Sequence, residues 1–354
     1  MKVALLAHDR FPIAPPFSGG LESFTWHLAR GLKCRGMEVV VFAAPGSDPE
    51  LGIEELDVEP LVLSDEARND VAMPPEAQVR ETFSYLQVMR AFARRPDIDV
   101  VHNNSLHFLP IVMSPAIPQP LLTTLHTPAT PWLEPALRLT PTAPTVAVSD
   151  SVAQMWSKVT PARVIRNGVD PHEWRPGPGG DALVWSGRVV PEKAPHIAAL
   201  IASKAGWKLR IAGPIADRHY FEARLKPLLN EDITYVGHLD TQQLRTLVGN
   251  SAASLVTPAW EEPYGLVAAE AMACGTPVLA VARGGLSEIV RDPGGHTSQP
   301  GASEVETVAS AVAELPRVVA LDRTRVRHYA LEHCSLNVTV DAYAALYREL
   351  VSAA

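Results

Sequence analysis

Two glutamates in one short segment are the residues that most directly suggest chemistry. In "EEPYGLVAAEAMACGTPVLA", Glu262 stands just before a Pro-Tyr-Gly turn and Glu270 stands inside the apolar stretch that follows. Gly265 is expected to open a helix there. The first amides of a helix lack intrahelical partners and carry the positive end of its dipole, which suits a phosphate. The amides in question belong to Gly265, Leu266 and Val267.

The two carboxylates would lie on either side of such an anion. Glu262 precedes the helix, and Glu270 lies about a turn and a half into it. Each could also be an ordinary solvated acid, as most glutamates are. Glu270, however, is embedded among apolar neighbours and needs a polar partner. Paired acceptors around an anion site match a nucleotide-sugar, in which a diphosphate joins two sugars.

Strands and helices alternate along the chain, as hydrophobic runs and helical spacing indicate. In the first half, strands are expected at 2–8, 38–43, 99–101, 121–125 and 145–148, with helices at 24–32 and 76–95. In the second half, strands are expected at 182–186, 208–212, 233–236, 254–257 and 277–281, with helices at 195–205, 220–229, 241–248 and 265–273.

This alternation predicts two doubly wound α/β domains of parallel strands that face each other across a deep cleft. A Pro- and Gly-rich linker at 163–180 separates them, so we expect domains at 1–165 and 171–335. An apolar C-terminal helix at 337–354 is expected to pack back on the first domain. Ligands of such sheets bind at the carboxyl ends of the strands.

Composition restricts the partners. The chain has 354 residues and a formal net charge of -8, which argues against nucleic acid or an anionic membrane as the main partner. Its three cysteines are scattered, which excludes a disulfide framework and suits a reducing, cytoplasmic environment. The first residues read as a strand rather than a signal peptide, and no apolar run is long enough for an integral membrane segment.

The glutamate segment resembles the glutamate-x7-glutamate motif of the retaining nucleotide-sugar glycosyltransferases of glycosyltransferase family 4, which have the GT-B fold. Further motifs follow the family's order along nearly the whole chain. They are "GGLE" at Gly19, Gly20, Leu21 and Glu22, "TLHTP" with His126, "AVSD" with Ser149 and Asp150, "IRNGVD" from Asn167 to Asp170, "SGRVVPEKAP" with Arg188 and Lys193, and "GGLSEIV" from Gly284 to Val290.

The resemblance implies a role for each matching residue. Arg188 and Lys193 would hold the donor diphosphate together with the helix amides. Glu270 would bind the ribose, Glu262 would lie beside the donor sugar, and His126 would lie near the reactive carbon. The catalytic set is then His126, Glu262, Arg188 and Lys193. Gly19 and Gly20 would let the backbone approach the donor, and His238 could contact the base.

The implied reaction is hexosyl transfer with retention, from a nucleotide diphosphate sugar to an acceptor hydroxyl. The acceptor would attack on the face that the diphosphate leaves, without a metal and without another cofactor. A UDP-sugar is favoured as donor. The acceptor could be a carbohydrate, a lipid or a natural-product core.

The sequence leaves other functional classes open. A nucleotide-sugar 2-epimerase shares the two-domain fold and would form an epimer without any acceptor. A catalytically silent nucleotide-sugar binder would keep the site without turnover. A dinucleotide-dependent oxidoreductase would need Gly-x-Gly-x-x-Gly directly after the first strand, whereas Gly19 and Gly20 follow a long loop.

His102 and His107 could face the acceptor or belong to the core.

Overall fold

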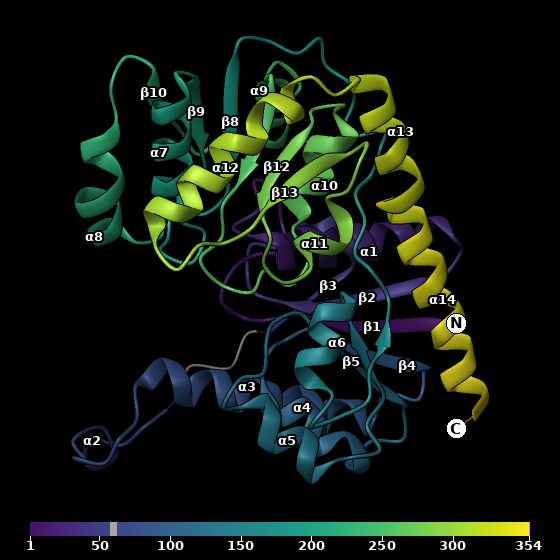
Figure 1. The fold of residues 1–354 in the computed structure, drawn as a ribbon. Coiled ribbons are helices and arrows are strands. Elements are labelled where there is room, and N and C mark those ends of the chain that lie inside the picture. The colour runs from purple at the N-terminus through teal and green to yellow at the C-terminus, as the bar shows by residue number, and fades with distance from the viewer. Residues whose placement is uncertain (57–61, 354) are drawn as a thin grey trace.

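A computed structural model describes residues 1–56 and 62–353, and two parallel sheets dominate it (Figure 1). The first sheet has seven strands in the order β3-β2-β1-β4-β5-β6-β7. Its strands are β1 (Lys2–Leu6), β2 (Glu38–Ala43), β3 (Ile53–Glu55), β4 (Val100–Asn103), β5 (Leu121–Leu125), β6 (Thr145–Ala147) and β7 (Arg163–Val164). The helices among them are α1 (Gly20–Cys34), η1 (Pro49–Leu51), α2 (Asp65–Arg68), α3 (Glu76–Phe92), α4 (Phe108–Met113), η2 (Ser114–Ala116), α5 (Leu133–Leu139) and α6 (Asp150–Trp156).

The second sheet has six strands in the order β10-β9-β8-β11-β12-β13. They are β8 (Ala182–Ser186), β9 (Lys208–Ala212), β10 (Ile233–Gly237), β11 (Ala253–Val256), β12 (Val278–Val281) and β13 (Gly295–Ser298). The helices of this half are α7 (Pro195–Ala205), α8 (Arg218–Tyr220), η3 (Phe221–Leu225), η4 (Lys226–Leu228), α9 (Thr241–Gly249), α10 (Leu266–Ala273), α11 (Leu286–Ile289) and α12 (Glu304–Val319). Both strand orders place β1 and β8 centrally, as expected for doubly wound sheets.

The last two helices connect the halves. α13 (Arg323–His333) packs on α10, and α14 (Leu336–Ala353) then runs down the side of the molecule to pack on α1 and β4 of the first sheet (Figure 1). Tyr343 and Tyr347 are fully buried there, in a cluster with Val3 and Leu28. The Tyr347 hydroxyl bonds to Nδ1 of His102 at 2.7 Å. The C-terminal helix is therefore part of the first sheet's core.

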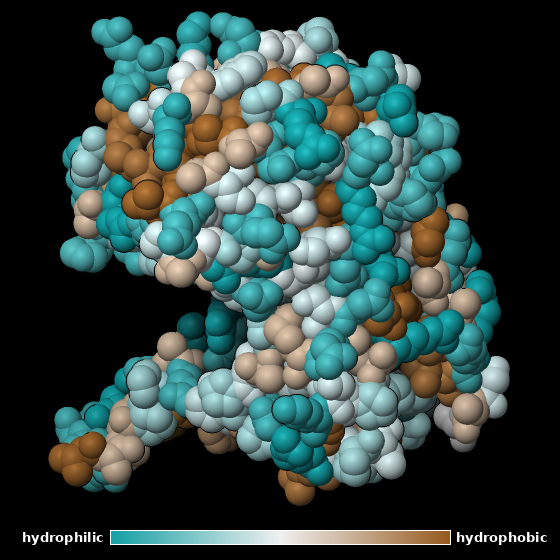
Figure 2. Space-filling view, in the orientation of Figure 1, coloured by the Kyte–Doolittle hydropathy of each residue, from teal (hydrophilic) through white to brown (hydrophobic). Residues whose placement is uncertain are grey.

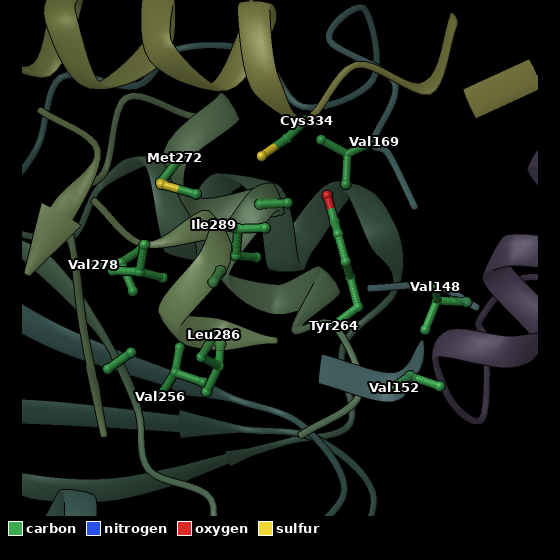
Figure 3. Close-up of a cluster of buried hydrophobic side chains, with 14 of the residues drawn as sticks. Val148, Val152, Val169, Val256, Tyr264, Met272, Val278, Leu286, Ile289 and Cys334 are labelled. Carbon is green, nitrogen blue, oxygen red and sulfur yellow. The ribbon is translucent and has the colours of Figure 1, made fainter. Parts of the chain in front are cut away.

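The two halves also touch through apolar side chains. Val148 and Val152, which flank the start of α6, belong to the same buried cluster as Tyr264 and Leu286 from the second half (Figure 3). This contact fixes the relative position of the segments that carry Gly265 and the end of β6.

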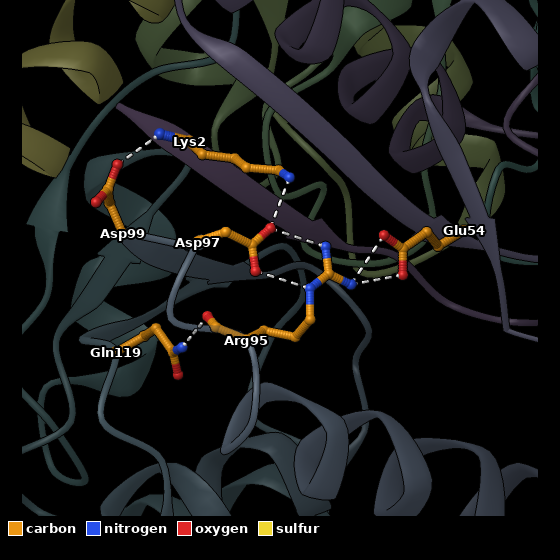
Figure 4. Close-up of polar contacts among 6 residues, drawn as sticks. All are labelled: Lys2, Glu54, Arg95, Asp97, Asp99 and Gln119. Carbon is orange, nitrogen blue, oxygen red and sulfur yellow. Dashed lines mark hydrogen bonds and ion pairs between the residues drawn. The ribbon is translucent and has the colours of Figure 1, made fainter.

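Charged residues pair along the edge of the first sheet where its strands begin, at the amino ends of β1 and β4 (Figure 4). Arg95 bonds to both oxygens of Glu54 at 2.9 Å and also to Asp97, which in turn accepts from Lys2 at 2.7 Å. The hydrogen bonds from Arg95 and Lys2 hold the pKa of Asp97 well below its usual range. The charged side chains at this edge are thus paired with one another. A ligand is expected at the other edge, where the carboxyl ends of the strands lie.

Several short strands and helices depart from the sequence expectations. The short helices α2, α4, α5, α6 and α11 were not predicted. β3, β7 and β13 were not predicted, because they are short and have few of the long apolar runs that mark buried strands. The single helix expected at 220–229 is instead a succession of α8, a π-helical turn and a 3-10 turn that contains Pro227. A proline has no amide hydrogen to donate and disfavours a continuous α-helix.

Candidate active site

A cavity of about 440 Å³ lies between the two halves, beside the carboxyl ends of strands from both sheets. Figure 2 shows the molecule deeply hollowed between its upper and lower parts. Every residue to which the sequence assigned a role lines this cavity: Gly19, Gly20, His126, Arg188, Lys193, His238, Glu262, Gly265, Leu266, Val267 and Glu270. Residues far apart in sequence are thus brought to one surface.

Glu262 and Lys193 form an ion pair in the cavity wall. The Lys193 ammonium donates to both carboxylate oxygens of Glu262, at 2.8 and 2.6 Å. The indole N–H of Trp260 donates to the same carboxylate at 3.0 Å, and the ammonium lies 5.3 Å from the centre of its ring. An ammonium has three N–H donors, so one remains for a ligand. Three hydrogen bonds hold the carboxylate, and the Glu262 side chain is only 10% exposed.

Gly265 ends the turn before α10 in a left-handed conformation, with φ of +97°. A Cβ at this position would lie 2.4 Å from Cδ2 of Leu286, so glycine is required for both conformation and space. Gly265 is the N-cap, and the helix itself begins at Leu266, one residue later than expected. The free amides of its first turn belong to the residues that line the cavity.

Glu270 is a half-buried carboxyl group with an altered proton affinity. Burial raises its pKa to about 7, the charge of His27 opposes this, and the charge of Glu173 adds to it. No side-chain hydrogen bond or ion pair engages the Glu270 carboxyl within residues 1–56 and 62–353. It is therefore an available hydrogen-bond acceptor in the cavity.

His27 and Glu173 connect α1 to the segment between the two sheets. His27 Nε2 and Glu173 Oε2 are 2.8 Å apart, and His27 Nδ1 bonds to the carbonyl of Ser23. Burial lowers the pKa of His27, but the bond with Glu173 and the nearby acidic charges outweigh it, so the net pKa is raised. Sequence analysis did not identify this pair, because its members are 146 residues apart.

His126 directly follows β5, and its ring contacts Phe24 edge-on with centroids 4.9 Å apart. Its Nε2 lies 2.7 Å from Oδ1 of Asn104. Burial lowers the pKa of His126 to about 3, so the ring is neutral. With the proton on Nε2 shared with Asn104, Nδ1 is left as an acceptor.

The two glycines of "GGLE" lie where the halves come closest. A Cβ on Gly19 would stand 3.9 Å from Nε of Arg188, and one on Gly20 would stand 3.1 Å from Cδ1 of Leu266. Arg188 is 41% exposed in its side chain and has Glu192 at 3.9 Å. Its guanidinium is thus accessible from the cavity. His238 directly follows β10, lines the cavity and is exposed.

His102 and His107, the two histidines that could have faced the acceptor, make contacts within and around the first sheet instead. His102 is fully buried and bonds to Thr124 and Tyr347. His107 caps α4 through Nδ1 and stacks on Tyr85. Neither lines the cavity.

A polar pair that sequence analysis missed does line it. His8 Nε2 and Glu22 Oε1 are 2.9 Å apart, and both side chains are 6% exposed. Glu22 was visible only as the last residue of "GGLE", and nothing in the sequence joined it to His8.

In the part of the chain that the structure describes, no group of three or more His, Cys, Asp and Glu side chains could hold a metal ion. In the same residues, no helix is long and apolar enough to cross a membrane.

Comparison with known proteins assigns the family. Residues 18–173 match the family model described as Glycosyltransferase Family 4, and residues 173–316 match Glycosyl transferases group 1. The D-inositol 3-phosphate glycosyltransferase of Mycobacterium tuberculosis (strain F11) is 32% identical over 417 residues, covering 99% of this chain and 83% of the relative. The chain belongs to glycosyltransferase family 4. As a family 4 glycosyltransferase, it transfers a sugar from a nucleotide-sugar donor.

Solved structures show the same GT-B fold over the entire length. AviGT4, a glycosyltransferase of avilamycin A biosynthesis, matches with a TM-score of 0.74 at 24% identity, covering 100% of this chain and 98% of AviGT4. The Anabaena protein HepE, solved with UDP and glucose, matches with a TM-score of 0.74 at 17% identity, covering 99% and 100% of the two chains. The predicted fold, two doubly wound domains facing across a cleft, is confirmed.

Proposed function

We propose that this family 4 enzyme transfers a hexose from a UDP-sugar to an acceptor hydroxyl, with retention of anomeric configuration and without a metal ion. The observation that carries the proposal is one cavity in which Arg188, Lys193 and the start of α10 face Glu270. Two cations and a helix N-terminus suit a diphosphate, and a nearby free carboxylate suits a ribose. The preference for UDP draws on HepE, which was solved with UDP and glucose.

In the proposed step, the bond from the anomeric carbon to the diphosphate oxygen breaks as the acceptor oxygen bonds to the same face. The acceptor proton moves to the departing diphosphate. Arg188, the third N–H of Lys193 and the α10 amides would stabilise the charge that develops on the diphosphate. Glu262 keeps lone pairs for donor-sugar hydroxyls, and His126 Nδ1 can accept from another.

The proposed domain division stays at 1–165 and 171–335, with 337–354 assigned to the first domain. Closure of these domains around the donor would exclude water from the reacting carbon. The acceptor is a carbohydrate, a lipid or a natural-product core in this proposal.

A thermal-shift experiment with UDP, GDP and ADP tests the donor assignment. Of the three nucleotides, we expect only UDP to raise the melting temperature of the wild type. In Glu270→Ala, UDP should no longer raise it. Stabilisation by GDP or ADP instead would overturn the choice of base, and a full shift in the variant would overturn the ribose site. Incubation with UDP-glucose alone separates a transferase from a 2-epimerase, which would accumulate an epimer.

A further inference from the structure

The buried His8–Glu22 pair has no part in the donor site proposed above. His8 follows β1 and Glu22 lies in the first turn of α1, yet their side chains meet in the cavity wall. Buried ionisable pairs contribute little net stability, because desolvation offsets their attraction. The location of this one, in a cavity built for a substrate, points to binding.

Hydrogen bonds define the charge of the pair. The backbone N–H of Arg10 donates to Nδ1 of His8 at 3.2 Å, so Nδ1 carries no proton. The imidazole hydrogen is then on Nε2 and is donated to Oε1 of Glu22. His8 in this form is neutral and orients the Glu22 carboxylate without cancelling its charge. Among the described residues, Oε2 of Glu22 has no hydrogen-bond partner.

The free oxygen lies beside Gly19, which also lines the cavity. A Cβ on Gly19 would stand 3.1 Å from Oε2 of Glu22 and 3.9 Å from Nε of Arg188. The carboxylate and the guanidinium therefore face the same gap in front of Gly19. Because Arg188 is proposed to hold the leaving diphosphate, this gap is where an acceptor hydroxyl approaches on the same face.

The surrounding wall carries no excess of positive charge. Of the described cavity-lining residues before position 150, Arg10 alone is a lysine or arginine. Its side chain is 66% exposed and its Nη2 lies 3.7 Å from Oε1 of Glu81. With Glu22 charged, this wall disfavours a phosphate, since like charges repel in a partly desolvated site.

We infer that Glu22 binds the acceptor hydroxyl, that His8 positions Glu22, and that the acceptor is uncharged near that hydroxyl, as a sugar or polyol is. This inference rests on the proposed function. The hydroxyl shares its one hydrogen between Oε2 of Glu22 and the departing diphosphate oxygen, while its own oxygen faces the anomeric carbon. As the acceptor oxygen bonds to that carbon and the bond from the carbon to the diphosphate breaks, the shared proton goes to the diphosphate oxygen, and Glu22 ends the step as the carboxylate it was. On this inference, a phosphate ester such as D-inositol 3-phosphate, the compound in the relative's name, is a poor acceptor.

Water is an acceptor present in every assay, so UDP release from UDP-glucose tests the role of Glu22. We expect Glu22→Gln to lower kcat for this hydrolysis by about tenfold to a hundredfold, the range for losing a charged hydrogen bond. The Kd for UDP-glucose, measured by calorimetry, stays within about twofold of wild type. Glu134→Gln, a matched change on α5 outside the cavity, leaves both values unchanged.

His8 is tested through its conservative variant. His8→Gln keeps an N–H donor and should retain more of kcat than His8→Ala, with the Kd for UDP-glucose unchanged in both. A general loss of packing would lower the rate equally in the two variants and would contradict a positioning role.

Three results would overturn the inference. The first is an unchanged kcat in Glu22→Gln. The second is a higher Kd for UDP-glucose in that variant, which would place Glu22 on the donor. The third is a saturable acceleration of UDP release by D-inositol 3-phosphate. Failure of the proposed function looks different, because wild-type enzyme would then neither bind UDP-glucose nor release UDP.

Discussion

Lowering the pH from 8 to 6 should weaken donor binding, because the ribose hydroxyls need an ionised Glu270 as their acceptor. Burial raises the pKa of Glu270 to about 7. Its carboxyl is then about 90% ionised at pH 8 and about 10% ionised at pH 6. If only the ionised form binds, the apparent Kd rises by about tenfold over this range, as expected when the competent fraction falls tenfold.

Calorimetry with UDP-glucose measures this directly, since its diphosphate has no proton to lose in that range. At pH 7 the free carboxyl is about half protonated, so binding should release about half a proton, seen as a dependence of the enthalpy on the buffer. The sign is fixed: a carboxyl with a raised pKa gives up its proton to bind, so affinity increases with pH. Glu270→Gln should bind weakly at both pH values, without the tenfold change.

Equal affinity of the wild type at pH 6 and 8 would refute this reasoning. So would a tenfold change that persists in Glu270→Gln, because the titrating group would then be another one. His27 and Glu173, whose charges act on Glu270, are the groups to test next. Loss of the pH dependence in Glu173→Gln would assign the titration to this pair.

Further substitutions probe the rest of the site. Lys193→Ala should raise the calorimetric Kd for UDP-glucose by about tenfold to a hundredfold, because a charged hydrogen bond to the diphosphate is lost and Glu262 loses its ion-pair partner; an unchanged Kd would remove Lys193 from the clamp. Glu262→Ala and His126→Ala should lower kcat for UDP release by roughly a hundredfold, through misplacement of the donor sugar, with smaller effects on Kd; a loss confined to Kd would contradict this. Gly265→Ala should lower stability by roughly 1–3 kcal/mol in denaturant unfolding, because a left-handed residue acquires a Cβ that collides with Leu286; wild-type stability would show that the turn relaxes freely.

The periodic features of the fold could be predicted from the sequence. Buried parallel strands are continuous apolar runs, so β1, β2, β8 and β12 were visible. β7 has only two residues, Arg163 and Val164, and its place in the sheet depends on pairing with β6 rather than on its own composition. Short edge strands of this kind carry little local signal.

Local signals also revealed one side of the active site better than the other. Glu262, Gly265 and Glu270 lie within a single turn and helix, so their spacing could be interpreted before the fold was known. The His8–Glu22 and His27–Glu173 pairs form only when α1 is placed against β1 and the inter-sheet segment. Each of these residues alone is unremarkable in sequence, and tertiary packing creates the pair.

The most direct test of the central claim follows the sugar released from UDP-glucose by proton NMR. Enzyme with UDP-glucose and a metal chelator should release UDP together with α-glucose, detected before mutarotation, because a retaining transfer to water keeps the donor's α configuration. Initial release of β-glucose would contradict retention. Release that stops when the chelator is added would contradict a diphosphate clamp made by Arg188, Lys193 and the start of α10 alone.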